Sequence, residues 1–443
     1  MSAPVLSAHF QDRKPSAIRT AQIEFMKRTD GVDAVNTAIG NVSLPMHPAL
    51  QARMRALGAA GSPFVNGVVD YSATVGTVEA RAAVLNVIAA SGVKTDGLFA
   101  QITDGGSAAM ELIIVGLCGP AGSAEKPLLL IDAAYTNYKS FADRTGRRTV
   151  SVTRRLGDDG KFALPDLAEI EARIAREQPA ALVVIPYDNP TGHYYDHATL
   201  VALAKLCVKH NLWLVSDEAY RELFYLGGAP SSVWRLTEAE VPGITGRRIS
   251  IETASKVWNA CGLRIGALVT DNEALHVKAV AENTANLCPN TIGQWIFGAL
   301  AHEDHAALRA WFDTQRGYYR ELLATVFTGL KERLPRLIVS SPDASIYSVL
   351  DVKHIAKPGF DAMAFVLYCA QKGCVEIGGR KLTLLVSPMT GFYQAAAGEP
   401  NPGRTQMRIS FVDTPERMAL VPELFTRLFN EFEAGRQERD RIS

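Results

Sequence analysis

The stretch Ile249-Ser-Ile-Glu-Thr-Ala-Ser-Lys256, followed by Gly262-Leu-Arg-Ile-Gly266, carries the most information about the fold of this chain. An apolar run ends in two hydroxyl side chains and Lys256, and Arg264 follows eight residues later. A lone lysine is usually a solvated surface charge. The hydroxyls in front of this lysine and the arginine behind it instead suggest a site where an amine reacts and a phosphate is bound nearby.

Short apolar runs alternate with segments of helical period on both sides of this stretch. The runs predict buried strands at Leu128–Ile131, Ala180–Ile185, Leu212–Val215, Ile249–Ile251 and Ile265–Val269. Residues 107–118 and 198–210 have the period of helices. Continuous apolar strands that alternate with helices predict a mostly parallel sheet covered on both faces, and so an α/β fold.

The two ends of the chain differ from this middle part. We expect an N-terminal segment, residues 1–65, that contributes to a small domain, a large domain at 66–325, and a small C-terminal α+β domain at 326–443. Within the last of these, we expect strands at 337–340, 346–352 and 407–412, and an amphipathic helix at 415–436.

The composition excludes several classes of function. The 443 residues include 46 basic and 46 acidic side chains, and no basic stretch indicates a nucleic-acid partner. No apolar run approaches the roughly 20 residues that span a membrane. The six cysteines form no Cys-x-x-Cys pair, so we interpret them as free thiols in a reducing compartment. We therefore expect a cytoplasmic protein with no membrane or nucleic-acid partner.

Polar side chains follow several of the predicted strands. In open α/β sheets, ligands bind beyond the carboxyl ends of the strands. The features in question are Thr103–Ser107 before a helix, the pair Tyr135 and Tyr138, Asn189–Gly192, Asp217–Tyr220, and Lys256. Each has an ordinary explanation, such as a turn, a helix cap or a packing tyrosine. Their shared position at strand ends favours one cleft that collects them all.

Side chains of these types, taken together, suit pyridoxal phosphate. That cofactor acts as an electron sink, and the protein must hold, tune and orient it. We expect Lys256 to form an imine with the cofactor aldehyde and to move protons, and Asp217 to pair with the ring nitrogen. Asn189 and Tyr220 suit the ring hydroxyl, and Tyr135 suits the ring face. We expect no metal.

The phosphate and the substrate need binding groups of their own. For the phosphate we expect backbone N–H groups at a helix start, two hydroxyls and one fixed cation, supplied by Gly105, Gly106, Ser107, Thr253, Ser255 and Arg264. For a substrate α-carboxylate, Arg408 in Met407-Arg-Ile-Ser-Phe411 is the candidate. The alternative for Arg408 is an ordinary surface arginine on a strand.

These motifs resemble those of the class I and II aminotransferases of fold type I, over most of the chain. The resemblance includes Asn36–Pro45 and Tyr71–Gly76, and it ends at Arg408-Ile-Ser-Phe. It implies a fold type I structure with a large sheet of the seven-stranded type, a pyridoxal phosphate cofactor and a homodimer with shared active sites. It further implies that Tyr71 reaches the phosphate of the other subunit, that Gly40 lies beside the substrate carboxylate, and that Asn189 touches both cofactor and substrate.

The chain departs from the family pattern around the substrate. It has Gly40-Asn-Val42 where Gly-x-Pro is frequent, Cys261 where a proline is frequent, and Ala344–Tyr347 in place of a Gly-Phe-Tyr motif. Dicarboxylate-specific relatives often carry a second arginine in the region that matches Ala281–Asn290, where this chain has none. This lowers the expectation of such an enzyme, although another basic residue could serve.

We therefore expect an aminotransferase of amino-acid metabolism that moves an amino group between an L-amino acid and a 2-oxo acid by a ping-pong mechanism. A lyase, decarboxylase or synthase that uses the same cofactor is the alternative, because the residues above bind cofactor and carboxylate in all of these enzymes. A non-catalytic regulator is a further alternative, but we find neither an attached DNA-binding module nor a basic patch. The sequence leaves the amino donor and acceptor open.

Overall fold

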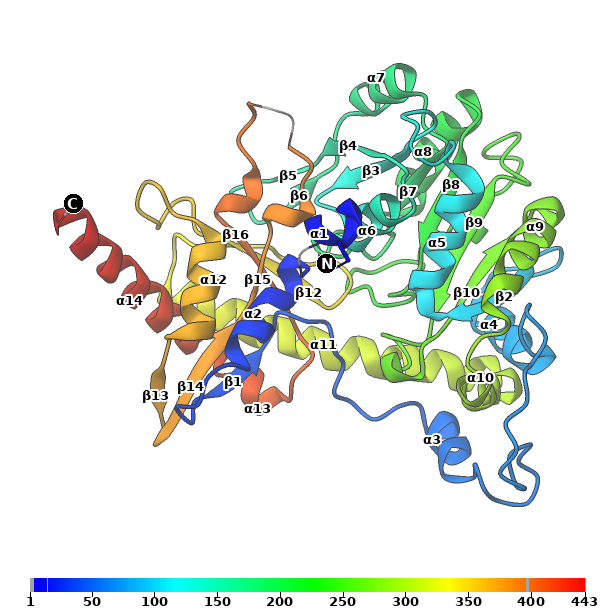
Figure 1. Cartoon of the computed structure of the whole chain (residues 1–443), viewed down its shortest axis with the longest axis horizontal. Helices are drawn as coiled ribbons and strands as arrows, with labels where there is room; N and C mark the ends of the chain where they lie inside the picture. Colours follow the sequence, from blue (N-terminus) through cyan, green and yellow to red (C-terminus); the bar gives the residue numbers. More distant parts are fainter. Residues whose placement is uncertain (1–3, 14, 396–397, 443) are drawn as a thin grey trace.

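The computed structural model describes residues 4–13, 15–395 and 398–442, and Figure 1 shows their arrangement. At its centre lies a seven-stranded sheet in the order β2-β10-β9-β8-β7-β3-β4. Its strands are β2 (Phe99–Asp104), β3 (Leu128–Asp132), β4 (Thr149–Thr153), β7 (Ala181–Val184), β8 (Trp213–Asp217), β9 (Arg248–Thr253) and β10 (Ile265–Thr270). β10 is antiparallel to both of its neighbours, and all other adjacent pairs are parallel. The predicted large, mostly parallel sheet is confirmed.

Helices cover both faces of this sheet. Alternate residues of each apolar strand point to opposite sides, so both faces are apolar and need to be buried. In β3, Leu128 and Leu130 pack into one buried cluster, whereas Leu129 and Ile131 pack into another. The first cluster includes residues of α5 (Gly105–Leu117), α6 (Asn137–Arg144) and α9 (Glu273–Asn283). The second includes residues of α4 (Val78–Ala90), α7 (Leu167–Glu177), α8 (His197–Lys209) and α10 (Thr291–Gly298).

A second group of elements combines both ends of the chain. The antiparallel sheet β11-β12-β16-β15 consists of β11 (Ile338–Val339), β12 (Tyr347–Asp351), β16 (Gln406–Ser410) and β15 (Ser387–Pro388). A further sheet pairs β1 (Asp33–Asn36) with β14 (Arg380–Leu385), which also pairs with β13 (Val375–Ile377). The helix α12 (Ala362–Gln371) packs beside α2 (Ala17–Phe25). The long helix α11 (His305–Arg333) runs from these elements toward the central sheet (Figure 1).

The pairing of β1 with β14 supports the expected contribution of residues 1–65 to a small domain. The domain limits at 65 and 325 themselves stay a prediction. Shorter elements include α1 (Ala8–Asp12), α3 (Pro48–Arg55) and the β5–β6 hairpin (Arg155–Leu156 with Phe162–Ala163). None of the helices in the described ranges combines the length and the apolar character needed to cross a membrane.

Some sequence-based boundaries were wrong. The predicted single helix at 415–436 is two helices, α13 (Pro415–Met418) and α14 (Val421–Ile442). Pro422 lies in the first turn of α14, where its missing N–H costs no helical hydrogen bond, so a new helix starts there. β4 was not predicted because its residues, Thr-Val-Ser-Val-Thr, alternate apolar and hydroxyl side chains instead of forming an apolar run.

Candidate active site

A cavity of about 560 Å³ lies at the carboxyl ends of the parallel strands. The structure brings most of the predicted site residues together in its lining: Gly40, Gly106, Ser107, Tyr135, Asn189, Asp217, Tyr220, Thr253, Ser255, Lys256, Arg264 and Arg408. Gly105 lies just behind this lining. Tyr71 does not reach the cavity of its own chain and is 79% exposed.

Lys256 enters the cavity from a turn after β9. Its Nζ donates a hydrogen bond to the carbonyl of Gly40, on the loop that follows β1. A Cβ atom at Gly40 would lie 2.2 Å from the hydroxyl of Tyr347 and 3.1 Å from the Lys256 amine. Only glycine therefore lets this loop approach the lysine so closely.

Hydroxyl groups hold the turn that carries Lys256. The Thr253 and Ser255 hydroxyls are 2.8 Å apart, and the Ser255 backbone N–H donates to Thr253 Oγ1 over 3.1 Å. Both side chains line the cavity next to Arg264, whose backbone is left-handed with φ of 53°. This conformation directs the strand that follows back into the sheet, while the guanidinium stays at the cavity.

The start of α5 and Arg264 form an anion site. Gly105 has φ of +76°, and a Cβ atom there would lie 2.2 Å from Arg264 Nη2. Gly106 is less restricted, but its Cβ would still lie only 3.0 Å from Ile251 Cγ2. The free N–H groups of a helix N-terminus, two hydroxyls and a guanidinium suit a phosphate. The donor set therefore fits the phosphate of pyridoxal phosphate.

Asp217 is a carboxylate without a cation. It ends β8, and its Oδ2 accepts a hydrogen bond of 2.5 Å from the Tyr138 hydroxyl. Its Oδ1 accepts one of 3.1 Å from the backbone N–H of Ala219. Within the described ranges no arginine, lysine or histidine pairs with it, and burial raises the pKa of its carboxyl. A protonated ring nitrogen would supply the missing positive charge, so this residue also fits the cofactor.

Arg408 is a cation without an anion. It lies on β16 and is only 2% exposed, so the alternative of a surface arginine is wrong. Its Nη1 donates to Asn189 Oδ1 over 3.0 Å and its Nη2 to the Ala38 carbonyl over 2.7 Å, whereas its buried Nε has no partner among the described residues. A buried guanidinium with only neutral partners favours an incoming carboxylate.

Phenol groups surround the space between these charges. The hydroxyls of Tyr220 and Tyr347 are 2.8 Å apart, and Asn189 Nδ2 donates to Tyr220 over 3.4 Å. Burial raises the pKa of Tyr135 to about 12 and that of Tyr220 well above its usual range, so both phenols stay neutral and can donate hydrogen bonds.

Sequence reasoning missed three lining residues. Tyr347 was noted only within a departure from a motif, and Tyr138 only as the second member of a pair. Arg19, on α2, was not singled out, because nothing in its local sequence distinguishes it from a surface arginine. Arg19 lines the cavity, and its side chain has no hydrogen-bond or ion-pair partner in the described ranges.

Comparisons with known proteins agree with this geometry. Residues 52–414 match the family model of aminotransferase class I and II. The chain is 28% identical to an aspartate/prephenate aminotransferase of Thermus thermophilus, over 96% of this chain and 98% of that protein. It is 26% identical to an arginine–pyruvate transaminase of Pseudomonas aeruginosa, over 62% and 64% of the two chains. The solved structure of a Thermus thermophilus aspartate aminotransferase with maleate superposes with a TM-score of 0.76 at 24% identity, covering 96% of this chain and all of that one.

Proposed function

The chain belongs to the class I and II aminotransferases, and from this premise we propose that its preferred amino acid carries a second, side-chain carboxylate. Like its family, the enzyme depends on pyridoxal phosphate and moves an amino group between an L-amino acid and a 2-oxo acid. The observation that carries the proposal is the unpaired guanidinium of Arg19 in the cavity that also holds Lys256 and Arg408.

The positions of the site residues support a role for each of them. Pyridoxal phosphate, when bound, supplies the electron sink for the electrons of the substrate Cα–H bond. Lys256 would hold the cofactor aldehyde and would take the Cα proton of the substrate as general base. Asp217 would pair with the ring nitrogen and keep it protonated, and Arg408 would bind the α-carboxylate and so orient the bonds at Cα.

The balance of charge in the cavity supports a second substrate carboxylate. Apart from Lys256, three cations line the cavity, namely Arg264, Arg408 and Arg19, and Asp217 is the acidic residue of the lining. In our assignment the phosphate pairs with Arg264, the ring nitrogen with Asp217, and the α-carboxylate with Arg408. Arg19 then remains without an anion, and a guanidinium is suited to bind a carboxylate in a two-point contact.

Other features near Arg19 agree with this assignment. Ser16, three residues earlier and also in the cavity lining, caps α2 without using its side chain, so its hydroxyl can donate. Ile39 lies in the lining beside Gly40 and offers an apolar wall for the methylene groups of a substrate. The names of the relatives do not indicate whether the substrate has an acidic side chain, because one is named for aspartate and another for arginine.

Substitution of Arg19 with glutamine tests the substrate class. We expect kcat/KM for aspartate, glutamate or 2-aminoadipate to fall roughly 10-fold to 100-fold, because a hydrogen bond to a charged group contributes about 1.5–3 kcal/mol. Alanine and methionine serve as matched neutral substrates, and their kcat/KM should change less than about 3-fold. The initial rates of half-reactions with each amino acid give these values.

Two outcomes separate the parts of this proposal. An unchanged ratio of acidic to neutral substrates in the Arg19 variant would remove Arg19 from substrate binding, and the aminotransferase assignment would stand. Ammonia and pyruvate formed from a cysteine conjugate, with no oxo acid acceptor present, would instead favour a lyase.

We further propose a homodimer in which Tyr71 reaches the partner's phosphate site. The supporting observation is an exposed apolar region near Tyr71: Val65, Val68, Val69 and Leu287 are each about half exposed. The hydroxyl of Thr74 donates to the Leu287 carbonyl over 2.6 Å, which joins the two segments of this region. An apolar region of this kind favours burial against a second copy.

Sedimentation velocity and subunit mixing test the dimer. The wild-type protein should sediment at twice the mass of one chain. A Tyr71→Ala protein and a Lys256→Ala protein, both impaired alone, should recover activity when mixed, because one site in each hybrid keeps both residues. A monomer, or mixtures without recovery, would contradict the shared site.

We place the enzyme in the cytoplasm and in amino-acid metabolism. All six cysteines are free thiols, which supports a reducing compartment. Fractionation of cells that express a tagged chain would test the location.

A further inference from the structure

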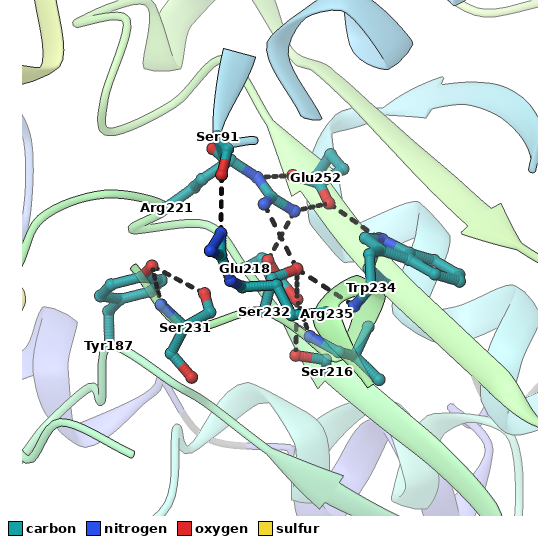
Figure 2. Close-up of polar contacts among 12 residues, drawn as sticks. Ser91, Tyr187, Ser216, Glu218, Arg221, Ser231, Ser232, Trp234, Arg235 and Glu252 are labelled. Atoms are coloured by element: carbon teal, nitrogen blue, oxygen red, sulfur yellow. Dashed lines mark hydrogen bonds and ion pairs between the residues drawn. The ribbon is translucent and has the colours of Figure 1, made fainter. Parts of the chain in front are cut away.

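A buried polar cluster lies behind the cofactor-binding strand ends. Figure 2 shows Arg221 between Glu218 and Glu252, with Ser232 and Trp234 around them. Glu218, Arg221 and Glu252 are 1%, 3% and 6% exposed. Fully buried ion pairs cost desolvation energy, and apolar residues of similar volume often stabilise a fold as well as such pairs do. Their position here therefore requires an explanation beyond packing.

Arg221 connects two neighbouring strands. Its Nη2 lies 2.5 Å from Oε2 of Glu218, the residue directly after β8, and 2.5 Å from Oε1 of Glu252, on β9. Its Nε donates a second hydrogen bond of 3.1 Å to Glu252 Oε2. The guanidinium thus holds Glu252 by two hydrogen bonds and forms an ion pair with Glu218. A flexible ammonium group could not reproduce the two-point contact.

Each carboxylate is the direct chain neighbour of a residue in the active-site cavity. Glu218 follows Asp217, and Glu252 precedes Thr253. Asp217 and Thr253 line the cavity, whereas Glu218 and Glu252 do not, as expected where successive side chains point to opposite faces. The Glu218 backbone N–H also donates to the Ile251 carbonyl over 3.0 Å, as the last hydrogen bond between the two strands.

The loop at 231–233 fixes the cluster from its other side. Glu218 Oε1 accepts hydrogen bonds from the Ser232 hydroxyl over 2.9 Å and from the Val233 backbone N–H over 2.9 Å. Glu252 Oε1 accepts one of 2.7 Å from Ser250. Burial raises the pKa of Glu218 to about 7, and the neighbouring Glu252 acts in the same direction. Among the described residues, Arg221 is thus the one cation that pairs with both Glu218 and Glu252 in this cluster.

We propose that Arg221 is a positioning residue for the cofactor: by tying Glu218 to Glu252, it fixes the distance between Asp217 and the turn that carries Lys256. This inference rests on the proposed roles of Asp217 and Lys256. Arg221 does not line the cavity. Its effect is geometric, because small displacements of groups that hold a reacting centre have large effects on rate.

Arg221→Lys tests the inference, since it keeps the charge and removes the two-point contact. Its matched control is Arg248→Lys. Arg248 lies at the opposite end of β9 and forms a similar contact with Asp271, with Nε and Nη2 each 2.7 Å from Oδ2. Both variants lose an arginine contact to a carboxylate at the same strand, buried at Arg221 and partly buried at Arg248, but only Arg221 is next to residues of the cavity. Both holoenzymes are prepared with pyridoxal phosphate.

The measurements are cofactor affinity, the visible circular dichroism of bound cofactor, and kcat and KM for one amino donor. For Arg221→Lys we expect a weaker dichroic band, cofactor affinity lowered at least 10-fold, and kcat lowered roughly 10-fold to 100-fold with KM changed much less. Arg248→Lys should match the wild type in all of these, even if its Tm falls equally. The dichroic band reports the orientation of the cofactor, which a purely stabilising role would not change.

Each outcome is decisive. An Arg221→Lys protein that matches Arg248→Lys in dichroism, affinity and kcat would overturn the inference. If it does not fold, Glu252→Gln replaces it, because that substitution keeps the shape and an acceptor for Arg221, and it should change the same readouts less strongly. A wild-type protein that binds no pyridoxal phosphate would instead refute the proposed function itself.

Discussion

Replacing Gly105 with alanine should weaken cofactor binding in addition to a loss of stability that any left-handed glycine position would show. Gly105 has φ of +76°, and an added Cβ would lie 2.2 Å from Nη2 and 2.8 Å from Cζ of Arg264. The atoms in conflict belong to the far end of a flexible side chain. The guanidinium can therefore move away while the backbone of α5 keeps its place.

The magnitude has two parts. A residue with a Cβ in the left-handed region costs about 1–3 kcal/mol of stability. The displaced guanidinium loses a charge-assisted hydrogen bond to the phosphate, which contributes about 1.5–3 kcal/mol. The second part acts on binding alone, so we expect the dissociation constant of pyridoxal phosphate to rise roughly 10-fold to 100-fold.

Gly97→Ala is the matched control for the first part. Gly97 has φ of +78°, and no atom lies within 4 Å of the position of its added Cβ. Urea denaturation of the two apo proteins should give similar losses of stability. Titration of the apo proteins with pyridoxal phosphate should separate them. Equal cofactor affinity of Gly105→Ala and Gly97→Ala would refute the assignment of Arg264 to the phosphate.

Three further substitutions give independent tests. Lys256→Ala should abolish both the visible absorbance of covalently bound cofactor and turnover, and normal turnover would contradict its role as base. Tyr138→Phe removes the hydrogen bond that lowers the pKa of Asp217, so fluorescence titration should show cofactor affinity reduced about 10-fold, and unchanged affinity would exclude this role. Burial raises the pKa of Glu218 from 4.5 to about 7, so the folded state holds its proton longer and stability should fall as pH rises between these values. In urea denaturation at pH 5 and pH 7.5, the free energy of unfolding of Glu218→Gln should decline less with rising pH than that of the wild type. An identical decline in both proteins would contradict the direction of this pKa shift.

The positions of Asp217, Lys256 and Gly106 beside the cavity were predictable from sequence, because they depend on local order. Asp217 and Lys256 each follow an apolar run, and parallel strands place their carboxyl ends at one edge. Gly105 and Gly106 open a helix directly after a strand. In each case the position of the side chain depends on an element of a few residues, which periodicity reveals.

The substrate side depends on contacts between distant segments, which a single sequence does not display. Arg408 was found by its motif, but its burial results from pairing of β16 with β12 and from contact with Ala38, 370 residues earlier. Tyr347 reaches the cavity through the same pairing. Arg19 lies on an N-terminal helix whose place against the cavity comes from tertiary packing.

The cluster around Arg221 was missed for a related reason. Arg221 follows Tyr220 in a segment that was interpreted only through Asp217 and Tyr220. Its partner Glu252 is 31 residues away, and an arginine in sequence usually indicates a solvated charge. Burial alone distinguishes it, and burial is a property of the folded chain.

The most direct test of the central claim is a single-turnover reaction of the pure holoenzyme with one amino acid and no acceptor. Each active site should release one equivalent of the corresponding 2-oxo acid and then stop, and added 2-oxo acid should restore turnover. Arg19 predicts that aspartate or glutamate gives the fastest burst. Continuous release of ammonia without an acceptor, or no oxo acid from any amino acid, would contradict the account.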